Sequence, residues 1–273
     1  MIDVLHFSFI QHAILAGLFT SIVCGIIGSL VVVNRIVFIS GGIAHASFGG
    51  IGIAYFLRLP VMPSTLGFTV LSSAVIAAVS AESKQRADAT IGVIWAVGMA
   101  LGIILIDLTP GYNVELMGFL FGSILTVSLF DLWMMVPLAG LIIGLTMIFY
   151  KGFLAMSFDE EFAKSKGIPV KTLYFVLMIM VGLAVVMVIR VVGLILVIAL
   201  LSIPPYIAEK YTHSLKGMMF LSSLLSYFFI LVGLYFSYVY NLSSGATIIM
   251  VAAGFFFLAF LVDHARERQH VHE

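Results

Sequence analysis

The chain has 273 residues, of which 62% are hydrophobic and only 10% are charged, and its mean hydropathy is +1.21. Soluble globular chains lie far from these values, so the composition indicates an integral membrane protein. The 13 basic and 13 acidic residues give a formal net charge of zero, and we expect no nucleic-acid partner. The single cysteine, Cys24, excludes an internal disulfide, a zinc finger and a redox cysteine pair.

Apolar runs of roughly 17 to 25 residues recur along the chain, each long enough for a helix to cross the bilayer. Because backbone amides in lipid must bond within their own segment, these runs predict an all-α integral membrane protein with about nine transmembrane helices. In chain order we expect them at residues 10–33, 37–57, 64–80, 90–108, 132–150, 172–189, 191–207, 217–238 and 245–262. The boundary at Arg190 is so short that eight spans remain an alternative. A half-buried re-entrant helix is expected at 114–127.

Lysine and arginine are distributed unevenly over the predicted loops. With the loop at 157–171 on the cytoplasmic side, every basic residue except Arg58 and Arg190 also lies on that side. This bias predicts an external amino terminus and an internal carboxyl terminus. We therefore expect one transmembrane domain, residues 1–273, that crosses the cytoplasmic (inner) membrane several times, with a cytoplasmic loop at 157–171 and a cytoplasmic tail at 263–273.

A glycine-rich stripe surrounds a histidine in the second predicted span. Gly41, His45, Gly49 and Gly52 fall within about 80° of one another on a helix. An ionisable side chain inside a span is costly and suggests function, and imidazole suits zinc. The alternative is a packing seam with a hydrogen-bonded histidine.

Other polar residues are weaker candidates for contact with a cation. Cys24 in the first span is a soft ligand or a small buried apolar residue. His6 and His12 lie at the external end, where they suit either metal capture or simple solvation. The acidic residues Asp107, Glu115 and Asp131 flank the external loop and either raise the local cation concentration or form a solvated rim.

The cytoplasmic loop contains a short sequence with helix start and stop signals. Ser157 and Glu160 have capping-box spacing, Gly167 suits a left-handed stop, and Pro169 prevents continuation. The docking residues that we expect here are Phe158, Asp159, Glu160, Glu161, Phe162 and Gly167. The two phenylalanines form an apolar stripe toward the cytoplasm, which fits either a protein partner or the membrane surface.

Two further features concern energy supply and a possible gate. Pro204 and Pro205 are expected to break the seventh span near its cytoplasmic end, at a gate or at an ordinary kink. The sequence has no G-x-x-x-x-G-K-[ST] phosphate loop, so any ATP hydrolysis that drives transport belongs to a separate chain.

Three blocks of the sequence carry a family resemblance. Residues 41–50 (GGIAHASFGG), 158–167 (FDEEFAKSKG) and 192–205 (VGLILVIALLSIPP) resemble, in order, the second span, the coupling segment and the late hydrophobic block of the zinc, manganese and iron ABC permeases. The resemblance implies the type II ABC importer permease fold, a homodimer, two ATPase subunits and an extracytoplasmic metal-binding protein. It also implies a transported divalent metal, with zinc favoured over manganese or iron, and no permanently bound cofactor.

One position departs from that family's pattern. Members often have Asp four residues before the histidine, whereas this chain has Gly41, so His45 lacks the neighbouring carboxylate. The alternatives are a siderophore or cobalamin permease and an ion-coupled secondary transporter. The secondary transporter is disfavoured because no acidic residue lies securely inside a predicted span. A membrane metalloprotease would need a ligand cluster such as H-E-x-x-H, which is absent.

Overall fold

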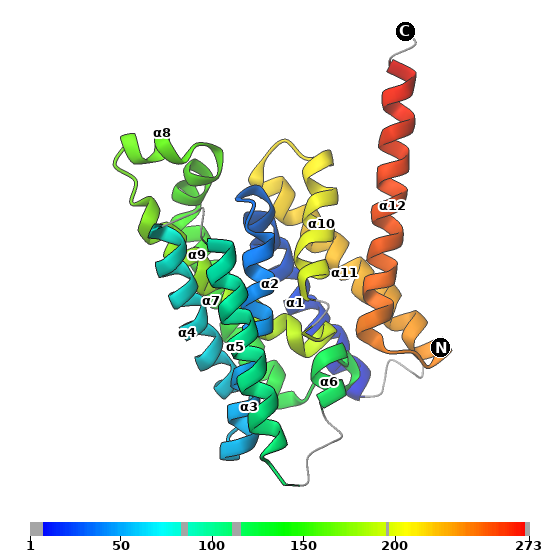
Figure 1. Ribbon diagram of the computed structural model, residues 1–273. Helices are drawn as coiled ribbons and strands as arrows, with labels where there is room; N and C mark the ends of the chain where they lie inside the picture. Colours follow the sequence, from blue (N-terminus) through cyan, green and yellow to red (C-terminus); the bar gives the residue numbers. More distant parts are fainter. Residues whose placement is uncertain (1–7, 83–86, 111–115, 195–196, 271–273) are drawn as a thin grey trace.

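The computed structural model describes residues 8–82, 87–110, 116–194 and 197–270, which form helices and no strands (Figure 1). The helices are α1 (Ser8–Val33), α2 (Val37–Ala46), α3 (Phe48–Leu57), α4 (Val61–Glu82), α5 (Ala87–Asp107), α6 (Leu116–Phe121), the 3-10 helix η2 (Ile124–Thr126), α7 (Leu129–Phe158), α8 (Glu160–Ser165), α9 (Val170–Val192), α10 (Val197–Tyr211), α11 (Leu215–Tyr240) and α12 (Ser244–His270). The all-helical prediction is confirmed.

Eight helical segments of the described residues are long and apolar enough to cross a membrane, with α2 and α3 together making one of them. The seventh expected span, 191–207, is different. Its first two residues belong to α9, which ends where Gly193 has a φ of 85°, and α10 has only 15 residues. Such a helix is about 22 Å long, shorter than the ~30 Å hydrocarbon core.

The ends of the described chain lie at opposite ends of the bundle. In Figure 1, α1 begins near the lower end and α12 finishes at the upper end, which it shares with α8. This arrangement agrees with the predicted external amino terminus and internal carboxyl terminus, which require the two ends of the chain to lie on opposite sides of the membrane.

The most buried segments form the centre of the bundle. In the most apolar stretch of each span, 78% of the residues are buried in the α2–α3 segment and in α9, and 67% are buried in α1. In α5 and α12 only 22% and 17% of these residues are buried. A span whose surface lies mostly outside the bundle faces lipid or another protein chain. These two helices are therefore the most exposed spans of the single chain.

The expected re-entrant helix at 114–127 is replaced by two short pieces, α6 and η2. Gly122, with a φ of 69°, separates them. It packs so closely against Gly193 at the end of α9 that neither residue leaves space for a Cβ atom. This close approach joins the segment after α5 to the turn between α9 and α10.

Pro204 and Pro205 do not break their helix, contrary to the expectation. Both lie inside α10, which continues to Tyr211. Since Pro205 has no N–H to donate, the carbonyl of Leu201 loses its usual helical partner. Gly28 of α1 packs against this carbonyl, and a Cβ at Gly28 would lie 2.6 Å from the oxygen. Gly28 thus allows α1 to pack closely against α10 beside Pro205.

Candidate functional site

The second span is divided at Ser47 into α2 and α3. The Ser47 hydroxyl donates to the carbonyl of Ala44 at 2.5 Å, and the Gly50 amide donates to the Ser47 carbonyl, three residues earlier, at 2.9 Å. A serine hydroxyl that bonds back to its own helix and a tightened turn are both common causes of helix bending. His45 therefore lies two residues from a helix junction.

His45 lies flat against Trp95 of α5. The two ring centroids are 4.2 Å apart and the ring planes differ by 7°. The Nδ1 atom of His45 is buried and has no hydrogen-bond partner within the described part of the chain. A buried polar nitrogen without a partner is costly, and a neutral imidazole nitrogen can also bind a metal ion.

The glycines of the predicted stripe face different neighbours. A Cβ at Gly41 would meet Ile198 of α10 at 2.5 Å. A Cβ at Gly49 would instead meet the Phe68 ring at 2.7 Å and the carbonyl of Gly98 at 3.1 Å. Gly49 thus permits tight packing with α4 and α5, while Gly41 lies beside α10, so the structure does not bring the stripe together around one open space.

The weaker metal candidates among the described residues form no metal-binding cluster of three or more ligands with His45. Cys24 is fully buried in α1, and His12 is half-buried near the start of that helix. His6 lies outside the described residues, as does Glu115, whereas Asp107 is exposed at the end of α5. Within the described ranges, no group of three or more His, Cys, Asp or Glu residues could hold a metal ion.

The predicted cytoplasmic helix exists but starts later than expected. Its cap is Asp159, whose carboxylate accepts from the Phe162 amide at 3.0 Å, and the helix α8 begins at Glu160. Ser157 belongs to α7 and instead accepts a hydrogen bond from Asn34 at 2.9 Å. The proposed Ser157 capping box is therefore wrong, because α7 extends about two turns beyond the predicted membrane span and includes Ser157.

The left-handed stop predicted at Gly167 is confirmed by its φ of 76°. Phe158 and Phe162 are 82% and 56% exposed, so the expected apolar surface is present. Lys164 lies 3.0 Å from Glu160 and 2.9 Å from Glu161. Its hydrogen bonds to Glu161 and Glu160 raise the pKa of the Lys164 ammonium above its usual value.

A cavity of about 530 Å³ lies between α8 and the α1–α2 turn. Glu160, Glu161 and Lys164 border it on one side and Arg35 on the other. Arg35 has a left-handed backbone with a φ of 59°. The cavity and the Asn34–Ser157 hydrogen bond thus lie between α8 and the start of α2, the helix that carries His45.

An ion pair that the sequence analysis did not predict joins α7 to α9. Arg190 Nη2 lies 2.5 Å from Asp131 Oδ2, and the side chains are 24% and 5% exposed, respectively. Asp131 also forms a capping box with Ser128 at the start of α7. The Ser128-x-x-Asp131 spacing signals this cap in the sequence, but nothing in it indicates the distant Arg190. Asp131 is thus not part of a solvated rim.

Comparison with known proteins decides the family. A family model described as the ABC 3 transport family matches residues 6–263. The chain belongs to this family. As an ABC 3 permease it is a multi-pass membrane transport subunit, and the ATPase activity lies in a separate subunit. The family also implies ATPase and substrate-binding partners.

The ABC 3 permease is similar to proteins over nearly its whole length. It is 48% identical to an uncharacterized membrane protein of Synechocystis, over 98% of this chain and 94% of that protein. It is 35% identical to the manganese transport system membrane protein MntC of Listeria monocytogenes, over 94% of this chain and 91% of that protein.

Two solved structures share the fold. PsaBC from Streptococcus pneumoniae, in complex with Fab, superposes with a TM-score of 0.86 at 33% identity, over 95% of this chain and 94% of that chain. An ABC transporter in an inward-facing conformation superposes with a TM-score of 0.75 at 17% identity, over 92% and 85% of the two chains. The predicted resemblance to ABC importer permeases is confirmed.

Proposed function

We propose that this ABC 3 permease conducts a divalent transition metal into the cell, with manganese as the favoured cargo. The observation that carries the proposal is the 35% identity, over 94% of this chain, to a protein named for manganese transport. A manganese import system permease of Streptococcus gordonii, ScaB, is 31% identical over 94% of this chain and agrees with it.

Zinc, the metal favoured by the sequence analysis, is the competing cargo. An imidazole without a neighbouring carboxylate suits zinc, whereas manganese prefers oxygen ligands. The names of the relatives support manganese. Manganese is favoured over zinc, because a conduit holds its ion only briefly and the proposed extracytoplasmic binding protein selects the ion before transfer.

His45 is the residue we propose to contact the passing ion. Its unpartnered Nδ1, the stacked Trp95 ring and the adjacent helix junction at Ser47 support this role. Trp95 fixes the plane of the imidazole, so the free nitrogen keeps one direction without a second hydrogen bond. Gly41 and Gly49 act as close-packing positions around it, and Cys24 and His12 remain weaker ligand candidates.

The assembly we propose contains two copies of this permease, two ATPase subunits that dock on α8, and an extracytoplasmic metal-binding protein. The exposed Phe158 and Phe162 support docking at α8. The low burial of α5 and α12 supports a contact between the two copies along these helices. Disulfide cross-linking of Val97→Cys and Met250→Cys, which replace side chains 60% and 72% exposed, tests that contact.

The deciding experiment measures uptake of radiolabelled manganese and zinc by cells that express the permease with its partner subunits. We expect manganese uptake that excess unlabelled zinc inhibits only weakly. Saturable zinc uptake without manganese uptake would contradict the proposed cargo, and uptake of neither metal would contradict the proposed function.

A substitution at Gly41 tests whether a carboxylate beside His45 changes the metal preference. Gly41→Asp places a carboxylate one helical turn from His45 and should shift preference further toward manganese. Because the new Cβ would meet Ile198, the variant is combined with Ile198→Ala, and Ile198→Ala alone is the control. An unchanged ratio of manganese to zinc uptake would remove Gly41 from the pathway.

A further inference from the structure

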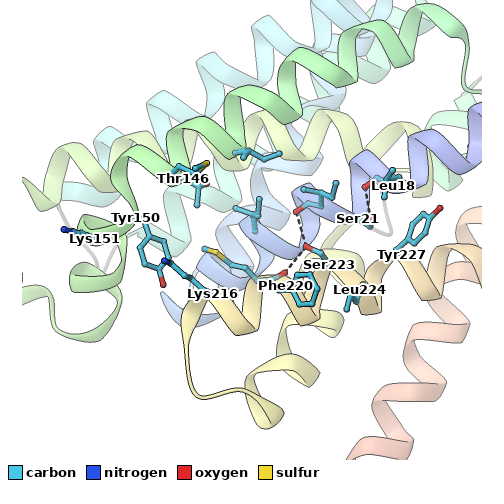
Figure 2. A pocket seen from close by; sticks show the side chains of 15 residues that line it. Leu18, Ser21, Thr146, Tyr150, Lys151, Lys216, Phe220, Ser223, Leu224 and Tyr227 are labelled. Atoms are coloured by element: carbon cyan, nitrogen blue, oxygen red, sulfur yellow. Dashed lines mark hydrogen bonds between the residues drawn. The ribbon is translucent and has the colours of Figure 1, made fainter.

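A groove with a volume of about 690 Å³ opens between α1, α7 and α11 (Figure 2). Two lysines, Lys151 and Lys216, lie at one end, beside Tyr150, and Leu18 and Tyr227 lie at the other. Lys216 is the second residue of α11, which begins at the end of the bundle that α8 occupies, so the lysines belong to the predicted cytoplasmic side.

The inside of the groove suits hydrocarbon. Its walls are mostly aliphatic or aromatic, and the three serine and threonine hydroxyl groups among them already donate to backbone carbonyls. Ser21 donates to Leu18 at 2.8 Å, Thr146 to Ile142 at 2.7 Å, and Ser223 to Met219 at 2.8 Å. A polar ligand therefore finds few free groups in the groove, whereas an acyl chain can replace the lipid that otherwise solvates its walls.

The groove is about as long as the hydrocarbon region of one bilayer leaflet is thick. Lys216 and Tyr227 are 11 residues apart on α11, or about 16 Å along the helix axis. Half of a ~30 Å hydrocarbon core is about 15 Å. A lipid whose headgroup lies at the lysines would thus reach the bilayer midplane with its acyl chain where the groove ends.

The charged end of the groove has the opposite sign to an anionic headgroup. Lys216 Nζ lies 4.9 Å from the centre of the Tyr150 ring, a contact that holds the ammonium at the opening. No carboxylate occurs among the described residues that line the groove. Lysines beside transmembrane helices on the cytoplasmic side attract anionic lipids.

We propose that this groove binds an anionic phospholipid of the cytoplasmic leaflet, with its phosphate between Lys151 and Lys216 and one acyl chain along α1, α7 and α11. A second copy of the permease is a poorer occupant. A two-fold contact centred here would bring four ammonium groups together without a lining carboxylate to neutralise them. The lipid site is independent of which metal is transported.

Native mass spectrometry of the intact transporter complex tests the site. The complex is exchanged into mixed micelles with phosphatidylglycerol or with phosphatidylcholine of the same acyl chains. We expect the permease to retain phosphatidylglycerol preferentially. Lys151→Gln with Lys216→Gln should weaken that binding about 25-fold, a factor of about five for each lysine near an anionic headgroup.

The matched control is Lys166→Gln with Lys171→Gln, which removes the same charge from the same predicted side outside the groove and should leave phosphatidylglycerol binding unchanged. Equal retention of the two lipids by the wild type would overturn the proposal, even if the double variant fails to accumulate. So would full retention by the double variant, or a Leu224→Cys disulfide that joins two copies through the groove.

Discussion

His45 has a neighbour that no local pattern reveals. Trp95 lies on a different helix, and the two rings stack only because α2 and α5 pack side by side. The sequence indicated that His45 was unusual, since an ionisable group in a span is costly, but it could not indicate what the imidazole faces. The stacked Trp95 ring and the unpartnered Nδ1 support the hypothesis that this nitrogen contacts the passing ion.

His45→Ala and His45→Gln separate metal contact from packing. If the imidazole touches the ion, both variants should reduce metal uptake at least tenfold while the complex still assembles, because neither side chain replaces the nitrogen ligand. If His45 only packs, Gln should restore uptake and Ala should lower the melting temperature. Uptake of radiolabelled metal, with co-purification of the partner subunits as the control for assembly, distinguishes these outcomes.

Asp131 and Arg190 should behave as a coupled pair. Removing one partner of a fully buried ion pair typically costs 3–5 kcal/mol, and here Asp131 is buried while Arg190 is 24% exposed, so Asp131→Asn and Arg190→Gln should each lower the free energy of unfolding by about 2 kcal/mol. The double variant should lose at least about 1 kcal/mol less free energy of unfolding than the two single variants lose together. Thermal unfolding of the wild type, the two single variants and the double variant in detergent measures this double-mutant cycle.

The control cycle uses the partly exposed pair Lys210–Asp263, with an Nζ–Oδ2 distance of 2.6 Å and side chains 26% and 28% exposed. Coupling there should stay below about 1 kcal/mol. Equal coupling in the two cycles would mean that burial does not strengthen the Asp131–Arg190 contact.

At the scale of single elements, α8 depends on one backbone conformation. Gly167 has a positive φ, and no atom lies within 4 Å of a Cβ built on it. Gly167→Val should therefore cost ~1 kcal/mol or more through the backbone alone, whereas Gly167→Asn should be tolerated because Asn adopts this conformation more readily.

The Val variant should insert into the membrane normally but lose ATPase association or transport. The reason is that the turn between α8 and α9 requires the left-handed backbone of residue 167. Co-purification of the ATPase with each variant provides the measurement. Normal association and full transport in Gly167→Val would show that docking does not require this stop.

The elements that sequence predicts well are those set by local chemistry. Hydropathy located the long apolar spans, and Gly167 identified a stop that the structure contains. The errors come from contacts between distant segments. Gly122 packs against Gly193 and separates the two pieces of the expected re-entrant helix, and α1 packs against α10 where Pro205 frees a carbonyl and a break was expected. Neither contact leaves a signal in its own part of the sequence.

For the whole molecule, the distribution of charge predicts which end faces the cytoplasm. Lys164→Cys at α8 should be protected from a membrane-impermeant maleimide added to intact cells, while Asp107→Cys at the opposite end should react. The native Cys24 is fully buried and provides a silent background. Permeabilised cells, in which both sites should react, are the control, and labelling of Lys164→Cys from outside would reverse the topology.

Ser47 keeps a helical backbone, with φ −58° and ψ −19°, so the second span continues through the junction as two arms. Each arm has 10 residues, so each is about 15 Å long. If α2 rotates by about 10° around Ser47, its end at Val37 sweeps about 2.5 Å, whereas His45, about 3 Å from the pivot, moves only about 0.5 Å. Such a rotation would move the end of α2 beside α8 and leave the imidazole almost stationary.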